Sequence, residues 1–206
     1  MKTILRLVLL TILLISNCCA SDDFKSLLHN GDIIFHESQS RQSKAIQLAT
    51  HSKYSHMGIV FIQDNSYFIL EAVQPVKFTP LDEWIARGKN SQIVVKRLKK
   101  SSTLLNAEII DKMKSEGKKY LGKDYDLYFE WSDHRIYCSE LVWKIYHDVV
   151  GVKVGELQKL SEFDLSSQEV KAKLKSRYGD KIPFDEPAIS PGTMFKSELL
   201  ETVYSN

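Results

Sequence analysis

The chain has 206 residues, of which 28 are basic and 26 acidic. This near balance argues against nucleic acid as a general partner, because a strongly basic surface is the first sign of such a protein. The length suits one domain with a sizeable hydrophobic core, and no internal repeat, Pro/Gly/Ser-rich linker or coiled-coil heptad divides the sequence.

The first twenty residues predict a signal peptide. Lys2 and Arg6 form a positively charged start, and the apolar run from Leu7 to Ile15 is shorter than the roughly 20 residues that a membrane-spanning helix needs. Ala20 is the predicted last residue removed. Cleavage there leaves equal numbers of basic and acidic residues. We therefore expect an exported, monomeric protein of the bacterial periplasm or envelope, with a single domain over residues 21–206.

The three cysteines are divided by this cleavage. Cys18 and Cys19 leave with the signal peptide and Cys138 stays alone, so no disulfide forms within the mature chain. A lone thiol in an exported protein is either buried or kept for its chemistry, because export leads to oxidising compartments. A lipid carried on Cys18 is the alternative, which the preceding Asn17 fits poorly because it is not a small apolar residue.

Glycine and turn residues mark off short apolar segments that predict strands. The first covers residues 31–35. Residues 56–62 and 67–73, separated by a turn at 64–66, predict a hairpin of antiparallel strands. Residues 92–98 are rich in β-branched side chains and predict a fourth strand. Because helices are interspersed and the clearest strand pair is a hairpin, the order predicts an α+β fold with an antiparallel sheet.

Apolar residues at helical spacing predict the helices between these strands. The predicted helices cover residues 38–50, 80–84, 104–120, a segment that begins near Cys138, and 167–178 with Ser166 or Ser167 as its cap. Residues 24–29 predict a short helix or turn, and 194–203 a last strand or an extended tail. Residues 183–191 are expected to be irregular, and 152–160 give no clear element.

The helix that begins near Cys138 is the first candidate for chemistry. Its apolar residues recur at about helical spacing and predict a buried face, formed by Leu141, Val142, Ile145 and Val149. A thiol at a helix N-terminus lies at the positive end of the helix dipole, beside N–H groups without intrahelical partners. Such surroundings favour the nucleophilic thiolate. The alternative is that Cys138 is a small buried hydrophobe, as isolated cysteines often are.

His56 and Glu71 are the candidates to assist this thiol. His56 begins the first strand of the predicted hairpin and Glu71 stands near the end of the second, so both lie at the end away from the turn. Cross-strand neighbours at that range let a carboxylate orient an imidazole. A cysteine docked against this edge would complete a nucleophile, a base and an orienting group. Singly, His56 could be a structural histidine and Glu71 could face solvent.

The remaining polar residues point to no second site. Asp32 reads as a turn or cap residue, and the spacing of the other histidines with Cys138 does not predict zinc ligands, so we expect no metal and no cofactor. The aromatic residues between Tyr125 and Trp131 are expected to pack or to line a pocket. The basic run from Lys96 to Lys100 predicts a solvated strand end or, alternatively, a contact with an anionic membrane surface.

The motifs resemble those of a known enzyme family. Gly31-Asp-Ile-Ile-Phe35 followed by Ser55-His-Met-Gly-Ile-Val60 is similar to the core of the NlpC/P60 cysteine hydrolases, in which the cysteine helix normally comes first. Here Tyr137-Cys-Ser-Glu-Leu-Val142 comes after both. That order resembles the circularly permuted YiiX/YebB-like branch, distantly similar to the lecithin retinol acyltransferases, and the resemblance covers roughly residues 30–145.

The resemblance implies a circularly permuted papain-like fold, with Cys138 as nucleophile, His56 as base and Glu71 as the third polar residue. It implies an amidase or peptidase that works through a thioester, acting on a peptide, an acyl amide or a lipid. The backbone of Cys138 or Ser139, or the hydroxyl of Tyr137 or Tyr125, would stabilise the oxyanion. The alternatives are an acyltransferase or thioesterase acting on lipid, and a non-catalytic lipid- or peptide-binding module.

Overall fold

The computed structural model describes residues 24–206, so the predicted signal peptide lies outside the described residues. Its centre is a six-stranded sheet with the strand order β4-β3-β2-β1-β5-β8. Every neighbouring pair in this sheet is antiparallel, as the hairpin pattern predicted. The strands are β1 Ile33–His36, β2 His56–Gln63, β3 Ser66–Glu71, β4 Lys77–Pro80, β5 Val94–Leu98 and β8 Leu200–Ser205.

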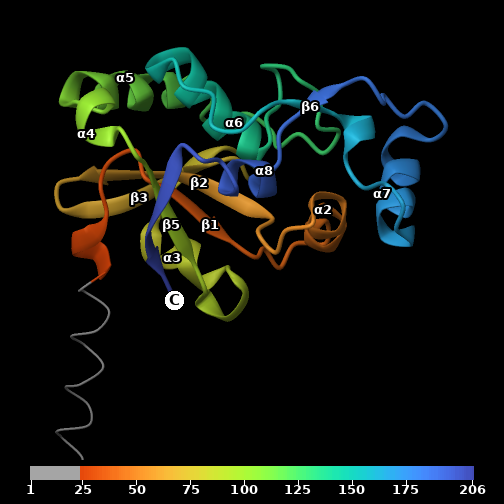
Figure 1. Ribbon diagram of the computed structural model, residues 1–206, viewed down its shortest axis with the longest axis horizontal. Helices are drawn as coiled ribbons and strands as arrows, with labels where there is room; N and C mark the ends of the chain where they lie inside the picture. Colours follow the sequence, from red (N-terminus) through yellow and green to blue (C-terminus); the bar gives the residue numbers. More distant parts are fainter. Residues whose placement is uncertain (1–23) are drawn as a thin grey trace, which may run out of the picture.

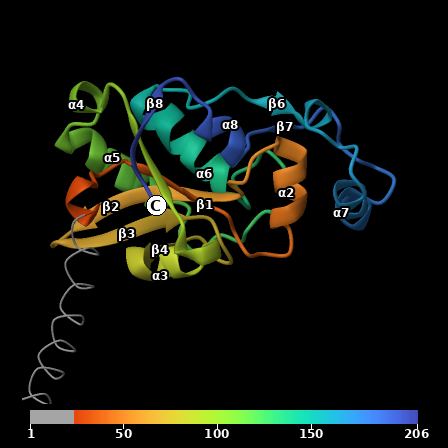
Figure 2. The ribbon, with the colours of Figure 1, turned by 60° about the horizontal axis from the view of Figure 1, so that its bottom comes forward.

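Helices cover both faces of the sheet (Figures 1 and 2). The helices α5 and α6 pack on one face and α3 lies on the other, while α2 and α7 stand beyond one end of the strands. None of the helices described between residues 24 and 206 is long and apolar enough to cross a bilayer. The helices are α2 Ser43–Thr50, α3 Leu81–Ala86, α4 Ser101–Leu104, α5 Ala107–Lys118, α6 Cys138–Ile145, α7 Gln168–Tyr178 and α8 Pro191–Phe195.

Shorter elements connect these parts. A π-helical segment continues α6, and a two-stranded ladder lies outside the main sheet. These elements are the 3₁₀ segments η1 Phe24–Leu27, η2 Lys89–Ser91 and η4 Leu160–Glu162, the π segment η3 Tyr146–Val150, and the strands β6 Gln158–Lys159 and β7 Pro187–Ala188.

The alternation of side chains along the strands explains the two-sided core. Ile33 and Phe35 of β1 belong to the apolar cluster that packs against α5 and α6, whereas Ile34 belongs to the cluster beneath α3. Successive side chains on a strand point to opposite faces, so a strand buried on both faces reads as a continuous apolar run. On α6, Leu141, Val142 and Ile145 are fully buried, as their spacing predicted.

The starts of two predicted helices differ from the structure because polar side chains act locally. The helix predicted over 38–50 begins only at Ser43, because Ser38 takes part in a turn with Ser40 and in a contact with Ser55. The helix predicted over 104–120 begins only at Ala107, as α5, because the Asn106 side chain caps it by accepting a hydrogen bond from Ile109 N, and the separate short helix α4 ends at Leu104. Such side-chain-to-backbone bonds compete with a continuous helix.

Some elements, both before and after α6, were not defined by the sequence. Strand β4 was not predicted, and the segment predicted as a last strand or tail contains the end of α8 followed by strand β8. By contrast, α7 agrees with the predicted range and is capped by the Ser167 hydroxyl at Val170 N. Helix α7 packs on α2 through Ala45, Val170 and Leu174, which form an apolar cluster of their own.

Candidate active site

Cys138 is the first residue of α6, the helix that packs across strand β2. The Glu140 carboxylate accepts a hydrogen bond from Tyr137 N at 3.3 Å and so fixes the chain where the helix begins. The side chain of Cys138 is 3% exposed, yet it lines an open cleft. The thiol therefore lies at the N–H end of a buried helix with one side facing a space that a substrate can enter.

His56 begins β2 and brings its ring between the thiol and a carboxylate. Its Nε2 atom lies 2.6 Å from Glu71 Oε2. The Cys138 thiol is close enough to the ring to raise its pKa, and because Nε2 is bonded to Glu71, Nδ1 is the ring nitrogen that remains for the sulfur. The structure thus brings the three predicted catalytic side chains together in one line. Two of them come from adjacent strands and the third from a helix 67 residues beyond Glu71.

Glu71 is completely buried, and two residues besides His56 donate hydrogen bonds to its carboxylate. Its other oxygen, Oε1, accepts a hydrogen bond from the Thr79 hydroxyl at 2.5 Å and another from the Arg87 guanidinium. Thr79 lies on the neighbouring strand β4, and Arg87 directly follows α3. Every oxygen of this buried carboxylate is therefore hydrogen-bonded, which is the condition under which a buried charge is tolerated.

The electrostatics of the pair favour an imidazolium beside a carboxylate. Burial lowers the pKa of His56, but hydrogen bonds and negative charge from Cys138 and Glu71 outweigh it and raise the pKa to about 9. Burial raises the pKa of Glu71, but hydrogen bonds from His56 and Thr79 and the positive charges of His56 and Arg87 lower it to about 2. Opposite charges in contact stabilise each other's charged form.

The rings of Trp84 and His36 stack beside the His56 ring. The Trp84 ring on α3 lies 5.9 Å from the His56 ring, and the His36 ring stacks on Trp84 at 4.0 Å. Burial, together with the nearby His56 and Arg87, lowers the pKa of His36 to about 3, so this ring is neutral at ordinary pH. His36 therefore packs as an uncharged flat ring beside a histidine that carries the charge.

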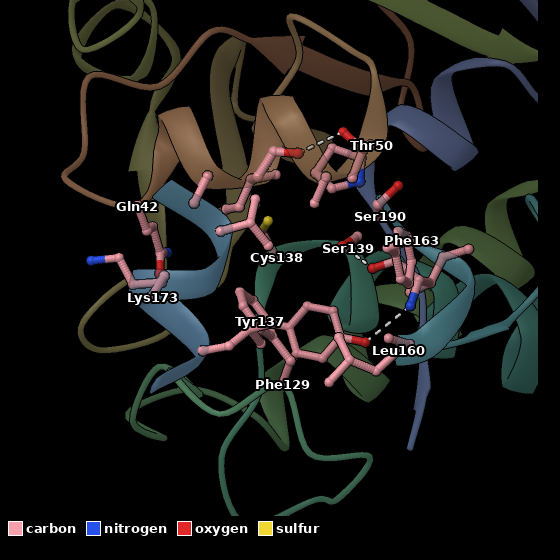
Figure 3. Close-up of a pocket in the computed structure, with 18 of the residues that line it drawn as sticks. Gln42, Thr50, Phe129, Tyr137, Cys138, Ser139, Leu160, Phe163, Lys173 and Ser190 are labelled. Atoms are coloured by element: carbon pink, nitrogen blue, oxygen red, sulfur yellow. Dashed lines mark hydrogen bonds between the residues drawn. The ribbon is translucent and has the colours of Figure 1, made fainter. Parts of the chain in front are cut away.

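The cleft beside Cys138 is strongly apolar. It lies between α2, α7, the start of α6 and residues 160–165 and 188–191, and the empty space there, including the solvent at its mouth, is about 730 Å³. Figure 3 shows the Cys138 sulfur among its lining side chains, with Gln42 and Lys173 on one side and Phe163 and Leu160 on the other. The apolar residues that line it are Ala45, Ile46, Ala49, Phe129, Leu160, Phe163, Leu165, Val170, Leu174, Ala188, Ile189 and Pro191.

The three candidates for the oxyanion differ in their placement. The Tyr125 side chain is partly buried and lines the cleft together with Cys138. The Tyr137 hydroxyl instead accepts a hydrogen bond from Ile189 N at 3.1 Å, and the Ser139 hydroxyl donates one to Ile189 O at 2.8 Å (Figure 3). The side chains of Tyr137 and Ser139 therefore hold the cleft wall, while the backbone N–H of Ser139 remains in the first turn of α6.

Several residues at this site were missed by the sequence analysis. Thr79 and Arg87 hold Glu71, and Gln42 and Arg177 line the cleft. No local pattern marks them, since each acts through a partner distant in sequence. Asp32, read as a turn residue, accepts a hydrogen bond from His29 N and also a bidentate pair from Arg97.

Comparison with known proteins identifies the family. A family model described as "Permuted papain-like amidase enzyme, YaeF/YiiX, C92 family" matches residues 27–204. The chain is 53% identical over 173 residues to the uncharacterized protein YiiX of Escherichia coli K12, and the match covers 84% of each chain. A crystal structure of YiiX from Escherichia coli O157:H7, titled a metalloprotein, matches with a TM-score of 0.82 at 50% identity, covering 86% of this chain and 97% of that one.

These likenesses agree with the permuted order of motifs and name a narrower family than NlpC/P60. Between residues 24 and 206, no group of three or more His, Cys, Asp or Glu side chains is arranged to hold a metal ion. The α+β fold with its antiparallel sheet agrees with the match to the solved relative. The chain is a papain-like cysteine amidase or peptidase that belongs to the permuted papain-like YaeF/YiiX, C92 family.

Proposed function

We propose that the chain hydrolyses an amide bond with Cys138 as nucleophile, His56 as general base and acid, and Glu71 as the group that orients the imidazole. The observation that carries this proposal is the 2.6 Å hydrogen bond between His56 and the buried Glu71 carboxylate, with the Cys138 thiol at the start of α6 acting on the same imidazole ring. Mutual hydrogen bonding of a nucleophile, a base and an orienting group is the signature of covalent catalysis.

The reaction follows from these positions. The Cys138 thiolate attacks the carbonyl carbon of the amide, and the carbonyl oxygen becomes an oxyanion beside the backbone N–H groups of Cys138 and Ser139. The His56 imidazolium then gives its proton to the leaving amine as the C–N bond breaks, which leaves a thioester on sulfur. Neutral His56 next removes a proton from water, which attacks the thioester and releases the acid.

We propose an acyl amide as the substrate, with its acyl chain in the cleft. The cleft walls are formed by Ala, Ile, Leu, Val and Phe side chains, and they begin at the Cys138 sulfur. An apolar lining with few polar groups gains free energy from burying hydrocarbon. A peptide substrate is the second candidate because the family includes peptidases. The backbone N–H and C=O groups of a peptide bound in this cleft would find few hydrogen-bonding partners.

The test is hydrolysis of fatty acyl p-nitroanilides of increasing chain length. We expect kcat/KM to rise with chain length until the cleft is filled. Mass spectrometry of the acid-quenched protein should find an acyl group on the peptide that contains Cys138. Cys138→Ser should bind the same compounds and release no p-nitroaniline. A medium-length peptide p-nitroanilide provides the comparison for peptidase activity.

The acyltransferase alternative uses the same thioester and differs only in the acceptor. Adding a primary amine or a lysolipid to the assay should leave the free acid as the main product if the enzyme is a hydrolase. A predominant transfer product would replace hydrolysis by acyl transfer. If Cys138 carries no acyl group under any of these conditions and Cys138→Ser binds as wild type does, the binding-module reading takes precedence.

We also propose that the protein is exported and acts as a monomer in the periplasm or on the envelope. The support is the charged start and short apolar run over residues 1–20. The intact mass of the protein from a periplasmic extract should correspond to a chain that begins at Ser21. A mass that includes a diacylglycerol on Cys18 would establish a lipid anchor instead.

A further inference from the structure

A chain of hydrogen bonds leads from α7 to the reactive thiol. The Arg177 guanidinium donates to Gln42 Oε1 at 2.7 Å, and Gln42 Nε2 donates to the Tyr125 hydroxyl at 3.0 Å. Tyr125 and Cys138 line the same cleft, and negative charge on Cys138 contributes to the raised pKa of Tyr125. All four side chains line the same cleft. Arg177 comes from α7, Gln42 directly precedes α2, Tyr125 lies between α5 and α6, and Cys138 begins α6.

The direction of these bonds follows from the chemistry of arginine. A guanidinium carries only donors, so the Gln42 atom that faces Arg177 must be the amide oxygen. The amide nitrogen of Gln42 therefore faces Tyr125, and the Tyr125 oxygen must accept. A hydroxyl has one proton to donate, so the O–H of Tyr125 is left free to donate to another acceptor, and the Cys138 sulfur in the same cleft is the acceptor that we assign to it.

The arginine that sets this direction is itself fixed. Its guanidinium lies over the Phe129 ring, 4.8 Å from the ring centroid, and is partly buried in the cleft wall. No ion pair joins Arg177 to a carboxylate in the part of the chain that the structure describes. A reversed Gln42 amide would place its N–H₂ against the guanidinium, donor against donor, so the amide keeps one orientation.

We propose that Gln42 and Arg177 are positioning residues that aim the Tyr125 O–H at Cys138, so that this hydroxyl stabilises the thiolate and then the oxyanion formed on attack. The proposal rests on the catalytic role of Cys138. Tyr125 donates a hydrogen bond and keeps its proton throughout, so no proton transfer is involved. Burial raises the pKa of Tyr125 well above its ordinary value, which agrees with a hydroxyl that stays protonated.

The experiment is a double-mutant cycle between Gln42 and Tyr125. Wild type, Gln42→Met, Tyr125→Phe and the double variant are compared by kcat on octanoyl p-nitroanilide and by the pH at which iodoacetamide alkylates Cys138 at half its maximal rate. Removing an oxyanion donor lowers kcat by roughly 10²-fold. We expect Tyr125→Phe to show such a loss, and Gln42→Met about a tenfold loss with KM unchanged. In the Tyr125→Phe background, Gln42→Met should have no further effect.

A second variant reverses the hydroxyl without removing the link to α7. In Gln42→Glu the carboxylate still accepts from Arg177, and its other oxygen accepts the Tyr125 proton and turns it away from sulfur. We expect a larger loss of kcat than in Gln42→Met, with a melting temperature close to wild type. The added charge alone also acts on the thiolate, and the Gln42→Glu effect in the Tyr125→Phe background measures that contribution.

The outcomes separate this inference from the proposed function. The inference is wrong if Gln42→Met and Gln42→Glu retain full kcat and the wild-type alkylation profile. It is also wrong if these substitutions lower kcat as much in the Tyr125→Phe background as in wild type. In either case Gln42 and Arg177 only join α2 to α7. The proposed function then still stands. If Cys138 of wild type alkylates like an ordinary thiol and no acyl-enzyme forms, the proposed function itself fails. Alkylation of Cys138 needs no substrate, so the double-mutant cycle can be measured by alkylation whichever amide the enzyme prefers.

Discussion

The Cβ atom of Glu71 lies 3.4 Å from the position that a Cβ on Gly58 would occupy, so the glycine leaves open the space beside this carboxylate. A Cβ on Gly58 would also stand 2.5 Å from Ile69 Cγ2 and 2.7 Å from Leu70 O. Strands β2 and β3 can therefore approach closely only because residue 58 has no side chain. That close approach lets Glu71 reach the His56 ring on the same face of the sheet.

We predict that Gly58→Ala destabilises the protein by about 1–3 kcal/mol, the usual cost of forcing an extra methyl group into a packed site. It should also lower kcat, because separating the strands lengthens the His56–Glu71 contact. Denaturant unfolding and amide hydrolysis measure the two effects. Ser66→Ala, at the exposed far end of the same hairpin, is the matched control and should change neither. An active, fully stable Gly58→Ala would show that the strand spacing is not critical.

The pH dependence of activity should report the His56 imidazolium. The pKa of His56 is raised to about 9, so kcat/KM should fall as the pH rises through about 9, where the proton needed by the leaving amine is lost. In Glu71→Gln the negative charge that stabilises the imidazolium is gone. The alkaline limb should then move to lower pH. A pH–rate profile of both proteins tests this, and an unmoved limb would assign it to another group.

The same two groups make folding stability depend on pH. His56 has a higher pKa in the folded protein than its ordinary 6.5, so its contribution is complete below pH 6.5 and is lost as the pH rises towards 9. Glu71 has a pKa lowered from 4.5 to about 2, so its contribution is complete above pH 4.5 and is lost as the pH falls towards 2. Urea unfolding across this range should show both losses in wild type.

Removing one partner at a time checks these two assignments. His56→Ala should flatten the decline of unfolding free energy between pH 6.5 and 9, because the group that releases the proton is absent. Glu71→Gln should flatten the decline between pH 4.5 and 2. Equal slopes in wild type and both variants would show that other residues control the pH dependence.

Alkylation of Cys138 offers a test of the pair without any substrate. An ordinary thiol titrates near pH 8.5. Because the His56 ring interacts with Cys138 and holds its proton to about pH 9, we expect iodoacetamide to modify Cys138 well below pH 8.5. His56→Ala should lose this low-pH reactivity. Peptide mass spectrometry identifies the modified residue, and identical profiles in the two proteins would contradict the assignment.

Substitution in the cleft should change chain-length selectivity. Ala49 lines the cleft on α2, and a phenyl ring there would fill part of the space beside Cys138. We predict that Ala49→Phe lowers kcat/KM for a dodecanoyl amide by about tenfold or more, on the scale of two or three buried CH₂ groups at about 0.8 kcal/mol each. The acetyl amide should be affected little. Ala172→Phe, exposed on α7 and outside the cleft lining, is the control.

Much of the fold could be predicted from local signals alone. The hairpin of β2 and β3 follows from apolar runs on either side of a polar turn, and α7 follows from a serine cap and helical spacing. The Cys138 helix likewise begins where its apolar spacing starts. Strand β4 was missed because a four-residue segment that ends in proline lacks the length and alternation of a strand signal.

The sequence by itself determined which residue types were available: one cysteine at a helix start, and a histidine and a glutamate near the same end of a hairpin. Only the tertiary structure decided how they are supported. Thr79 and Arg87 reach Glu71, Gln42 reaches Tyr125, and Arg177 reaches Gln42, across separations of 8 to 135 residues. Such contacts leave no periodic trace, because they depend on how distant elements pack. The apolar cleft has the same origin, since its walls come from helices that meet only in the folded chain.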